Sequence, residues 1–374
     1  MSAPRLRKGS AWRRWLMPLT LLAAALFLQT LASRNPQLVE RYYSDRLFPR
    51  ISQGLSLINS LFGFSIAELM IYVLVAVVIG ALVYQAREIY LRKPIAGLVL
   101  TDLLVLFWIT GAAMMLFLLF WGLNYQREPM RSKLGASGSN TTAEQLKKIS
   151  ETIVNEINSN YDASHQGEPV NAMPGRAQLN ELIESSYRQQ PLLGEVSKGR
   201  YGPAKPIYSS SVMSRLGLSG FYMPFTGEPN FNADQPAFDL PYVIAHEKAH
   251  QRGFAREDEA NFLAFVVCVN SANPYVRYSG YLNALKVVVA FITSDPEYYQ
   301  ALLARIGEGP RRDLQARAAF WSHYQGPARE MAARVNNSYL KANRIGSGAQ
   351  SYQEDVALIV AYYLTMAGEG AQRL

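Results

Sequence analysis

Residues 241–261 read Pro-Tyr-Val-Ile-Ala-His-Glu-Lys-Ala-His-Gln-Arg-Gly-Phe-Ala-Arg-Glu-Asp-Glu-Ala-Asn and contain the pattern His-Glu-x-x-His. On a helix, residues four positions apart stand on one face, so His246 and His250 can bind the same cation. Imidazole nitrogen is a good zinc ligand, and a catalytic zinc site has three protein ligands and a position open for water. Glu247 lies beside the first ligand, where it can take a proton from that water. The stretch predicts a Zn²⁺ site with Glu247 as its general acid/base.

The same stretch carries signals that begin and end a helix. Pro241 suits the first turn, where its missing N–H has no helical partner. Gly253 suits the left-handed position that ends a helix. Two of the chain's four histidines therefore lie four residues apart on one well-delimited helix, which a random arrangement rarely produces.

The third ligand is expected from the acidic segment after this helix. In a straight helix Glu257 would lie about 10 Å beyond His250, so a turn at Gly253 must fold the next helix back. Glu257 is favoured because Asn261 follows one turn later on the same face, where its amide can hydrogen-bond a ligand histidine. Glu259 is the main alternative, and a charged first turn that complements the helix dipole would explain the segment without a metal. The predicted zinc ligands are His246, His250 and Glu257.

Three apolar runs precede this region. Residues 15–33 carry no charge and follow a basic N-terminus, residues 66–84 have Glu68 as their only charge, and residues 103–123 have none. Each approaches the roughly 20 residues that a helix needs to cross a bilayer. The first run could instead be a cleaved signal peptide, because it follows basic residues and ends in small ones. Three such runs predict a multi-pass membrane protein.

The composition agrees with a membrane protein. Hydrophobic residues make up 49% of the chain and charged residues 18%, below the roughly 25% that is usual in soluble domains. The net charge of +8 comes from basic residues that flank the apolar runs, so no nucleic-acid partner is expected. The single cysteine excludes a disulfide framework and a cysteine-based zinc site.

The basic residues also predict the orientation. The N-terminus and the short connection after Tyr84, which holds Arg87, Arg92 and Lys93, are expected in the cytoplasm by the positive-inside rule. The connection 34–63 holds four arginines spread over a longer stretch, so the prediction depends on the density of charge. Three crossings then place the rest of the chain on the outer face of the cell membrane, and cleavage of the first run gives the same result.

The composition changes after the third run. Residues 132–142 are rich in Gly, Ser and Asn, which is typical of a flexible linker. Helical patterns dominate from there on, at 143–158, 177–189, 241–252, 257–269, 280–293, 313–337 and 352–366, with short extended runs at 205–209 and 220–224. The expected fold is mainly α, in three parts: a membrane domain with three transmembrane helices (1–126), a linker (127–142), and a mostly helical zincin-like domain with a small β element (143–374).

The motif region resembles known metallopeptidases. The segment Glu257-x-x-Ala260-Asn261 resembles the Glu-x-x-Ala-Asp that follows His-Glu-x-x-His in gluzincins, especially membrane-bound ones of the CAAX-prenyl-endopeptidase type. Asn261 in place of Asp and a much shorter gap between the motifs are departures from that family. The pattern His-Glu-x-x-His-x-x-Gly is also similar to metzincins, but Arg256 stands where they have a third ligand. A closer resemblance, through residues 121–125, 220–232 and 249–262, is to an uncharacterised bacterial family of three-span membrane proteins.

The gluzincin resemblance implies a zinc-dependent peptidase. In such enzymes a substrate often adds as a strand to a sheet edge beside the site. Residues 220–228 could supply this edge, and a loop that packs its aromatic side chains on the core is the alternative. Tyr339 and Tyr352 are candidates to polarise a scissile carbonyl.

Two functions remain open at this point. The first is a membrane-anchored zinc metallohydrolase, most simply a peptidase, whose partners are the lipid bilayer and a peptide or protein substrate. The alternative is a non-catalytic membrane sensor or scaffold that retains a structural metal site. The enzyme is favoured because Glu247 has no structural duty at a closed zinc site, where a fourth ligand is expected instead.

Overall fold

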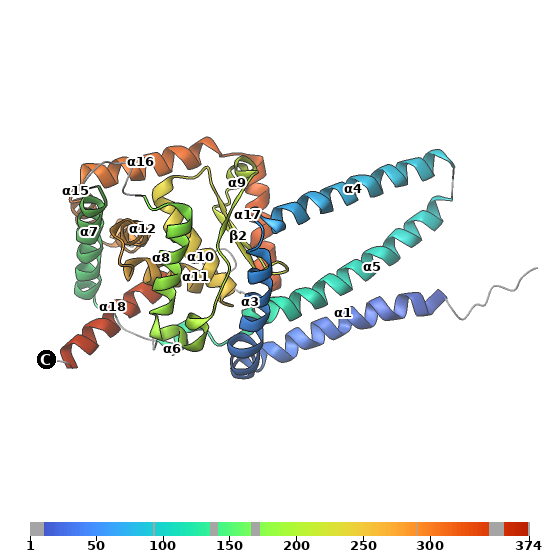
Figure 1. The fold of residues 1–374 in the computed structure, drawn as a ribbon, viewed down its shortest axis with the longest axis horizontal. Coiled ribbons are helices and arrows are strands. Elements are labelled where there is room, and N and C mark those ends of the chain that lie inside the picture. The colour runs from blue at the N-terminus through green and yellow to red at the C-terminus, as the bar shows by residue number, and fades with distance from the viewer. Residues whose placement is uncertain are drawn as a thin grey trace, which may run out of the picture.

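The computed structural model describes residues 11–92, 94–134, 141–165, 173–289, 291–343 and 355–372. The chain forms a body made mainly of helices, and three long helices project from one side of it, as Figure 1 shows. The mainly helical fold that the sequence predicts is confirmed. The zincin-like fold of the body stays a prediction.

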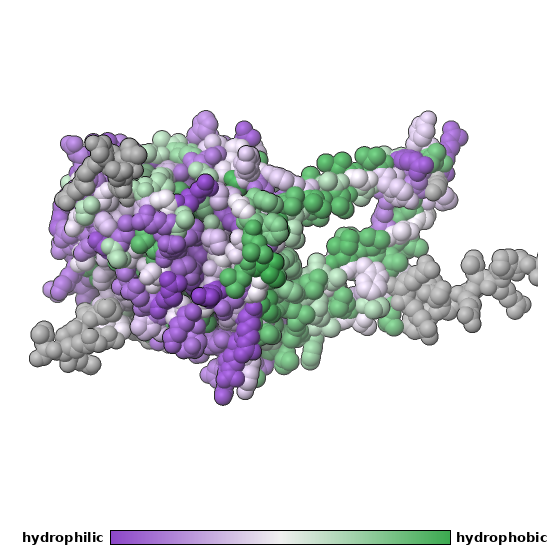
Figure 2. All heavy atoms as spheres, in the orientation of Figure 1, coloured by the Kyte–Doolittle hydropathy of each residue, from purple (hydrophilic) through white to green (hydrophobic). Residues whose placement is uncertain are grey.

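Among the described helices, three are long and apolar enough to cross a membrane: α1 (Ala11–Ser33), α4 (Ile66–Tyr90) and α5 (Ile95–Phe120). Their projecting parts expose apolar side chains, as the space-filling view in Figure 2 shows. A water-exposed surface of this extent is not stable in a soluble monomer, but it suits contact with lipid. The three helices thus support the prediction of a membrane protein.

The ends of these helices are arranged as expected for three successive crossings in alternating directions. The C-terminal ends of α1 and α5 and the N-terminal end of α4 adjoin the body, so the α4–α5 connection lies at the far end (Figure 1). Helix α1 packs along α5, whereas α4 diverges from this pair. Arg87 and Arg92 lie at the far end, and residues 1–10 and Lys93 of the predicted basic segments lie outside the described residues.

The connection between the first two candidate spans is helical and packs against the body, a feature that was not predicted from the sequence. Arg127 is buried and donates to the two carboxylate oxygens of Glu40 at 2.9 and 2.6 Å. The same guanidinium donates to the carbonyl of Gly253 at 3.0 Å, which ties the connection to the end of the motif helix. The connection comprises α2 (Pro36–Leu38), the π-helix η1 (Val39–Leu47) and α3 (Phe48–Asn59).

Within the described residues, three strands form a small sheet. β1 (Lys205–Ile207) pairs parallel to β3 (Glu228–Asn232), and β2 (Gly220–Met223) pairs antiparallel to the other side of β3. Both runs predicted as extended contain a strand, whereas β3 was not predicted. β2 is an edge strand among the described strands, and the motif helix α10 (Leu240–Gln251) packs against β2 and β3.

The main hydrophobic core surrounds α11 (Glu257–Val269), which is buried over nearly its whole length. Helices α10, α12 (Pro274–Ala284) and α18 (Asp355–Gln372) pack against it. A helix that is apolar on all sides is stable only inside such a core. The other elements of the body are η2 (Gly122–Gln126), α6 (Met130–Lys133), α7 (Ala143–His165), α8 (Arg176–Arg188), η4 (Pro191–Lys198), α9 (Ser210–Leu216), η5 (Ala237–Asp239), α13 (Lys286–Val289), α14 (Phe291–Ser294), α15 (Pro296–Ala304), α16 (Glu308–His323) and α17 (Pro327–Ala342).

Two helix predictions are wrong as single elements. The helix expected over 280–293 falls in α12, α13 and α14, and the second case is the helix expected over 313–337. The sequence pattern predicts a continuous helix over 313–337, but the structure has α16 and α17 with a break between them. Gly326 has φ 152°, and Pro327, which follows it, begins α17. Proline fits the first turn of a helix because its missing N–H has no partner there. The break lets α17 turn across the body instead of continuing along α16 (Figure 1).

Candidate metal centre

The end of α10 sets the geometry of the motif. The N–H of Gly253 donates to the carbonyl of His250 at 2.9 Å, and the N–H of Phe254 donates to the carbonyl of Ala249 at 3.2 Å. These two bonds form a Schellman motif, which requires a left-handed residue, and Gly253 has φ 89°. The predicted end of the helix is confirmed, and the turn folds α11 back onto α10.

Buried charges hold the far face of α10. Lys248 and Arg252 donate to the two carboxylate oxygens of Glu184 on α8, at 2.7 and 2.8 Å. Burial opposes ionisation of Glu184, but the two cations outweigh it and lower its pKa to about 2. A rotation of α10 about its axis would separate these buried charges and leave them without partners, which costs several kcal/mol. The ion pairs therefore hold α10 in one orientation.

The turn brings Glu257 opposite the two histidines. One ligand atom from each of His246, His250 and Glu257 lies within 4.8 Å of the others. Glu257 Oε2 is 3.3 Å from His246 Nε2, and Glu257 Oε1 is 3.8 Å from His250 Nε2. Ligand atoms bound at about 2.1 Å to a tetrahedral zinc ion lie roughly 3.4 Å apart, so small side-chain movements suffice to hold the metal. Two imidazoles and one carboxylate are also a donor set that catalytic zinc sites use.

Glu257, and not Glu259, faces the histidines. Glu259 is buried and accepts a hydrogen bond from the N–H of Met130 at 2.8 Å. Asn261 does not make the hydrogen bond with His246 or His250 that was predicted from the sequence. Tyr242 instead donates its hydroxyl to the backbone and side-chain carbonyls of Asn261, at 3.1 and 3.3 Å. Of the predicted third ligands, the structure therefore favours Glu257.

The tautomer of His250 follows from one hydrogen bond. Its Nδ1 lies 2.7 Å from the carbonyl oxygen of Phe254, which only accepts, so Nδ1 carries a proton. Nε2 is then the atom directed at Glu257 and available to a metal. Burial disfavours charge on both groups, but the two facing imidazoles lower the pKa of Glu257 below its usual range, and Glu257 raises the pKa of His250 to about 9. The cluster stabilises positive charge at the point where the three ligand atoms converge.

Glu247 lies beside the cluster without a full set of partners. The residue is 5% exposed, and its Oε2 has no hydrogen-bond partner among the described residues. Burial raises its pKa to about 7, although His246 and His250 oppose the shift. An unpaired buried carboxyl oxygen costs folding free energy, and such groups are common where function requires them.

The cluster opens into a cleft of about 690 Å³ between α10, β2 and α17. Trp121, the residue after α5, and Tyr125 of η2 both line it, and the Trp121 ring stands edge-on to His250 with 5.9 Å between ring centroids. Tyr125 donates to the hydroxyl of Tyr339 at 3.1 Å. Burial raises the pKa of Tyr339 to about 12, so its hydroxyl keeps its proton at neutral pH.

The cleft is lined by residues that are far apart in the sequence and whose proximity was not predicted. Tyr339 lines the cleft, as a group that polarises a carbonyl would have to, whereas Tyr352 lies outside the described residues. Trp121, Tyr125 and Tyr242 were not predicted as site residues. Trp121 and Tyr125 belong to the segment 121–125, which carries part of the family resemblance. That resemblance was the one sequence signal that pointed to them.

The fold and the cluster define a mainly helical protein with three candidate membrane spans and a His-His-Glu cluster that could hold a metal ion, in a cleft beside them. The model of the family described as "Protein of unknown function (DUF3810)" matches residues 43–360, and the chain belongs to this family. No curated protein and no solved structure matches the chain. Membership agrees with the resemblance to an uncharacterised family and leaves the chemistry of the site to be inferred from its residues.

Proposed function

We propose that the chain is a membrane-anchored, zinc-dependent hydrolase, and specifically a peptidase. The observation that carries the proposal is the convergence of His246, His250 and Glu257 next to Glu247, a buried carboxyl group with an unpaired oxygen. A structural zinc site is closed by a fourth protein ligand. Here the three ligand atoms instead border an open cleft.

Each group of residues in the cleft has a separate role in the proposed hydrolysis. His246, His250 and Glu257 would hold zinc, which would supply a Lewis acid that activates water. Glu247 takes the proton released from the attacking water and passes it to the leaving nitrogen. The hydroxyl of Tyr339, which accepts a hydrogen bond from Tyr125, can donate its own proton to the carbonyl oxygen as negative charge develops there.

The edge strand favours a peptide over other hydrolysable substrates. Consecutive residues Gly220, Phe221 and Tyr222 all line the cleft, although side chains alternate between the two faces of a strand. Such a pattern arises when the backbone edge of β2 borders the cleft. An extended peptide could pair with that edge and place a peptide bond beside Glu247.

Purified full-length protein is expected to contain about one zinc ion per chain. His246→Ala should lose most of this zinc, because two remaining ligands bind the metal weakly. His323→Ala, on the exposed surface of α16, is the matched control and should keep it. Metal content is measured by mass spectrometry after dialysis without chelator. Zinc far below one equivalent in the wild type, or equal zinc in the wild type and His246→Ala, contradicts the proposed site.

The body is proposed to lie on the outer face of the cell membrane, because basic residues concentrate at the far end of the spans. Alkaline phosphatase fused after Leu374 should therefore be active in intact cells, and a fluorescent protein that folds only in the cytoplasm should be dark there. Fusions after Arg92, at the opposite end of the spans, are the control and should behave in the reverse way. A fluorescent fusion after Leu374 would place the site in the cytoplasm.

A further inference from the structure

The candidate active site lies directly at the end of a candidate span. Helix α5 ends at Phe120, and the next residue, Trp121, contacts His250 with its ring. One side chain therefore separates the end of the span from a predicted zinc ligand. The cleft begins where the bilayer is expected to end.

The edge strand β2 leads from the cleft toward the same boundary. Its first residue, Gly220, lies against the general base, since a Cβ atom there would be 2.6 Å from Glu247 Oε1. In the turn beyond β2, Phe225 packs on Phe120 with 6.2 Å between ring centroids. The four residues of β2 cover about 10 Å at roughly 3.3 Å per residue. The strand thus spans the short distance between the reacting groups and the end of α5.

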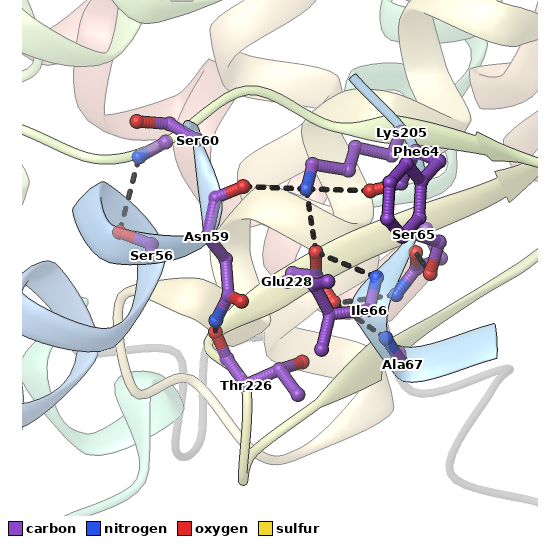
Figure 3. Close-up of polar contacts among 12 residues, drawn as sticks. Ser56, Asn59, Ser60, Phe64, Ser65, Ile66, Ala67, Lys205, Thr226 and Glu228 are labelled. Carbon is purple, nitrogen blue, oxygen red and sulfur yellow. Dashed lines mark hydrogen bonds and ion pairs between the residues drawn. The ribbon is translucent and has the colours of Figure 1, made fainter. Parts of the chain in front are cut away.

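The beginning of α4 is fixed to the other side of this hairpin, as Figure 3 shows. Glu228 of β3 accepts hydrogen bonds from the N–H groups of Ile66 and Ala67, the first residues of α4, at 3.1 and 2.7 Å. Lys205 of β1 forms a buried ion pair with Glu228 at 2.6 Å and donates to the carbonyls of Asn59, the last residue of α3, and of Phe64, just before α4. The hairpin is therefore held between the beginning of α4 and the end of α5.

An apolar opening between α4 and α5 leads to the hairpin. The two helices diverge in Figure 1, and Figure 2 shows an open space between their apolar side chains. Val73, Leu74, Val75 and Val77 are each more than half exposed. Consecutive helical residues point in directions about 100° apart, so α4 presents apolar side chains on every side at this level.

We propose that the substrate is a polypeptide anchored in the same membrane by an apolar helix. Its helix lies between α4 and α5, and the extended segment next to that helix pairs with the free edge of β2. The inference rests on the proposed peptidase function. Water adds across one peptide bond of this segment: the carbonyl carbon gains the hydroxyl group and the leaving nitrogen gains the proton that Glu247 carries. From the length of β2 and its turn, the cleaved bond lies about three to five residues beyond the helix.

The opening between α4 and α5 continues into the free edge of β2, and this continuity favours a membrane-anchored polypeptide as the occupant. Lipid can fill the opening but offers no backbone to pair with β2, and a soluble peptide can pair with β2 but leaves the opening unused. A chain with an apolar helix followed by an extended segment matches both surfaces at once. Because the hairpin lies at the end of the spans that adjoins the body, the inference holds whichever face of the membrane carries the body.

The test uses full-length protein in phosphatidylcholine vesicles with two sets of peptides. Both sets carry the same randomised ten-residue segment, but in one set it follows a 20-residue Leu/Ala helix and in the other it is free in solution. The anchored set should be cut at least 10-fold faster, about three to five residues beyond the helix as located by mass spectrometry. A six-residue insertion between helix and segment should leave the cut at the same distance from the helix, now inside the insertion.

Each other outcome has a definite meaning. Equal rates for the two sets would overturn the inference and leave the peptidase proposal intact, since lipid or a second copy of the chain would then fill the opening. Cuts that follow the segment into its new position after the insertion would also overturn it. Zinc-loaded protein that cuts neither set contradicts both proposals.

Discussion

Replacing Glu247 by glutamine is expected to reduce peptide hydrolysis by about two to four orders of magnitude, the usual contribution of a general acid/base. Glutamine has nearly the same shape but cannot accept the proton of the attacking water. Zinc should remain near one equivalent, because Glu247 does not belong to the group of three converging ligands. The measurement is the cleavage rate of a peptide library by full-length protein, together with metal content of the same sample.

This variant also separates the two candidate functions. A sensor or scaffold with a structural site would show no hydrolysis in the wild type, and Glu247→Gln would then leave its behaviour unchanged. The thermal unfolding midpoint provides the control for folding: glutamine should unfold at the same temperature or higher, because it is uncharged and Glu247 is buried. Loss of zinc in Glu247→Gln would show that Glu247 is a ligand and that its assigned role is wrong.

Glu257→Gln is expected to weaken zinc binding by more than about 100-fold, because even residues that only support a ligand contribute 10- to 100-fold. Its carboxylate lies 3.3 and 3.8 Å from the two imidazoles, and a neutral amide cannot replace its charge. Glu259→Gln makes the same chemical change two residues away. Its side-chain oxygen can still accept the hydrogen bond from Met130, so zinc affinity should change only a few-fold.

Zinc affinities of both variants can be measured by competition with a chelating dye, with circular dichroism as the check on folding. The pair of variants decides between the two third ligands that the sequence left open. If Glu259→Gln lost the metal and Glu257→Gln retained it, Glu259 and not Glu257 would be the third ligand.

The sequence alone determined features that depend on neighbouring residues. The three candidate spans follow from length and apolarity, which are properties of each segment by itself. The motif helix follows from Pro241, Gly253 and the four-residue spacing of His246 and His250, because capping and helical periodicity act within a few residues. Strands β1 and β2 lie within the two short runs, 205–209 and 220–224, that were predicted to be extended. These features are found where the sequence places them.

Tertiary structure decided the features that depend on distant contacts. Glu257 and Glu259 lie in the same first turn of α11, and only the direction in which Gly253 folds that turn back determines which one meets the histidines. The cleft joins Tyr125 after the third span to Tyr339 near the end of the chain. The sequence pattern shows which side chains are buried or polar, but it does not specify their partners. Those partners are fixed by the packing of α10, α11, α17 and the ends of the spans, where many weak contacts act together.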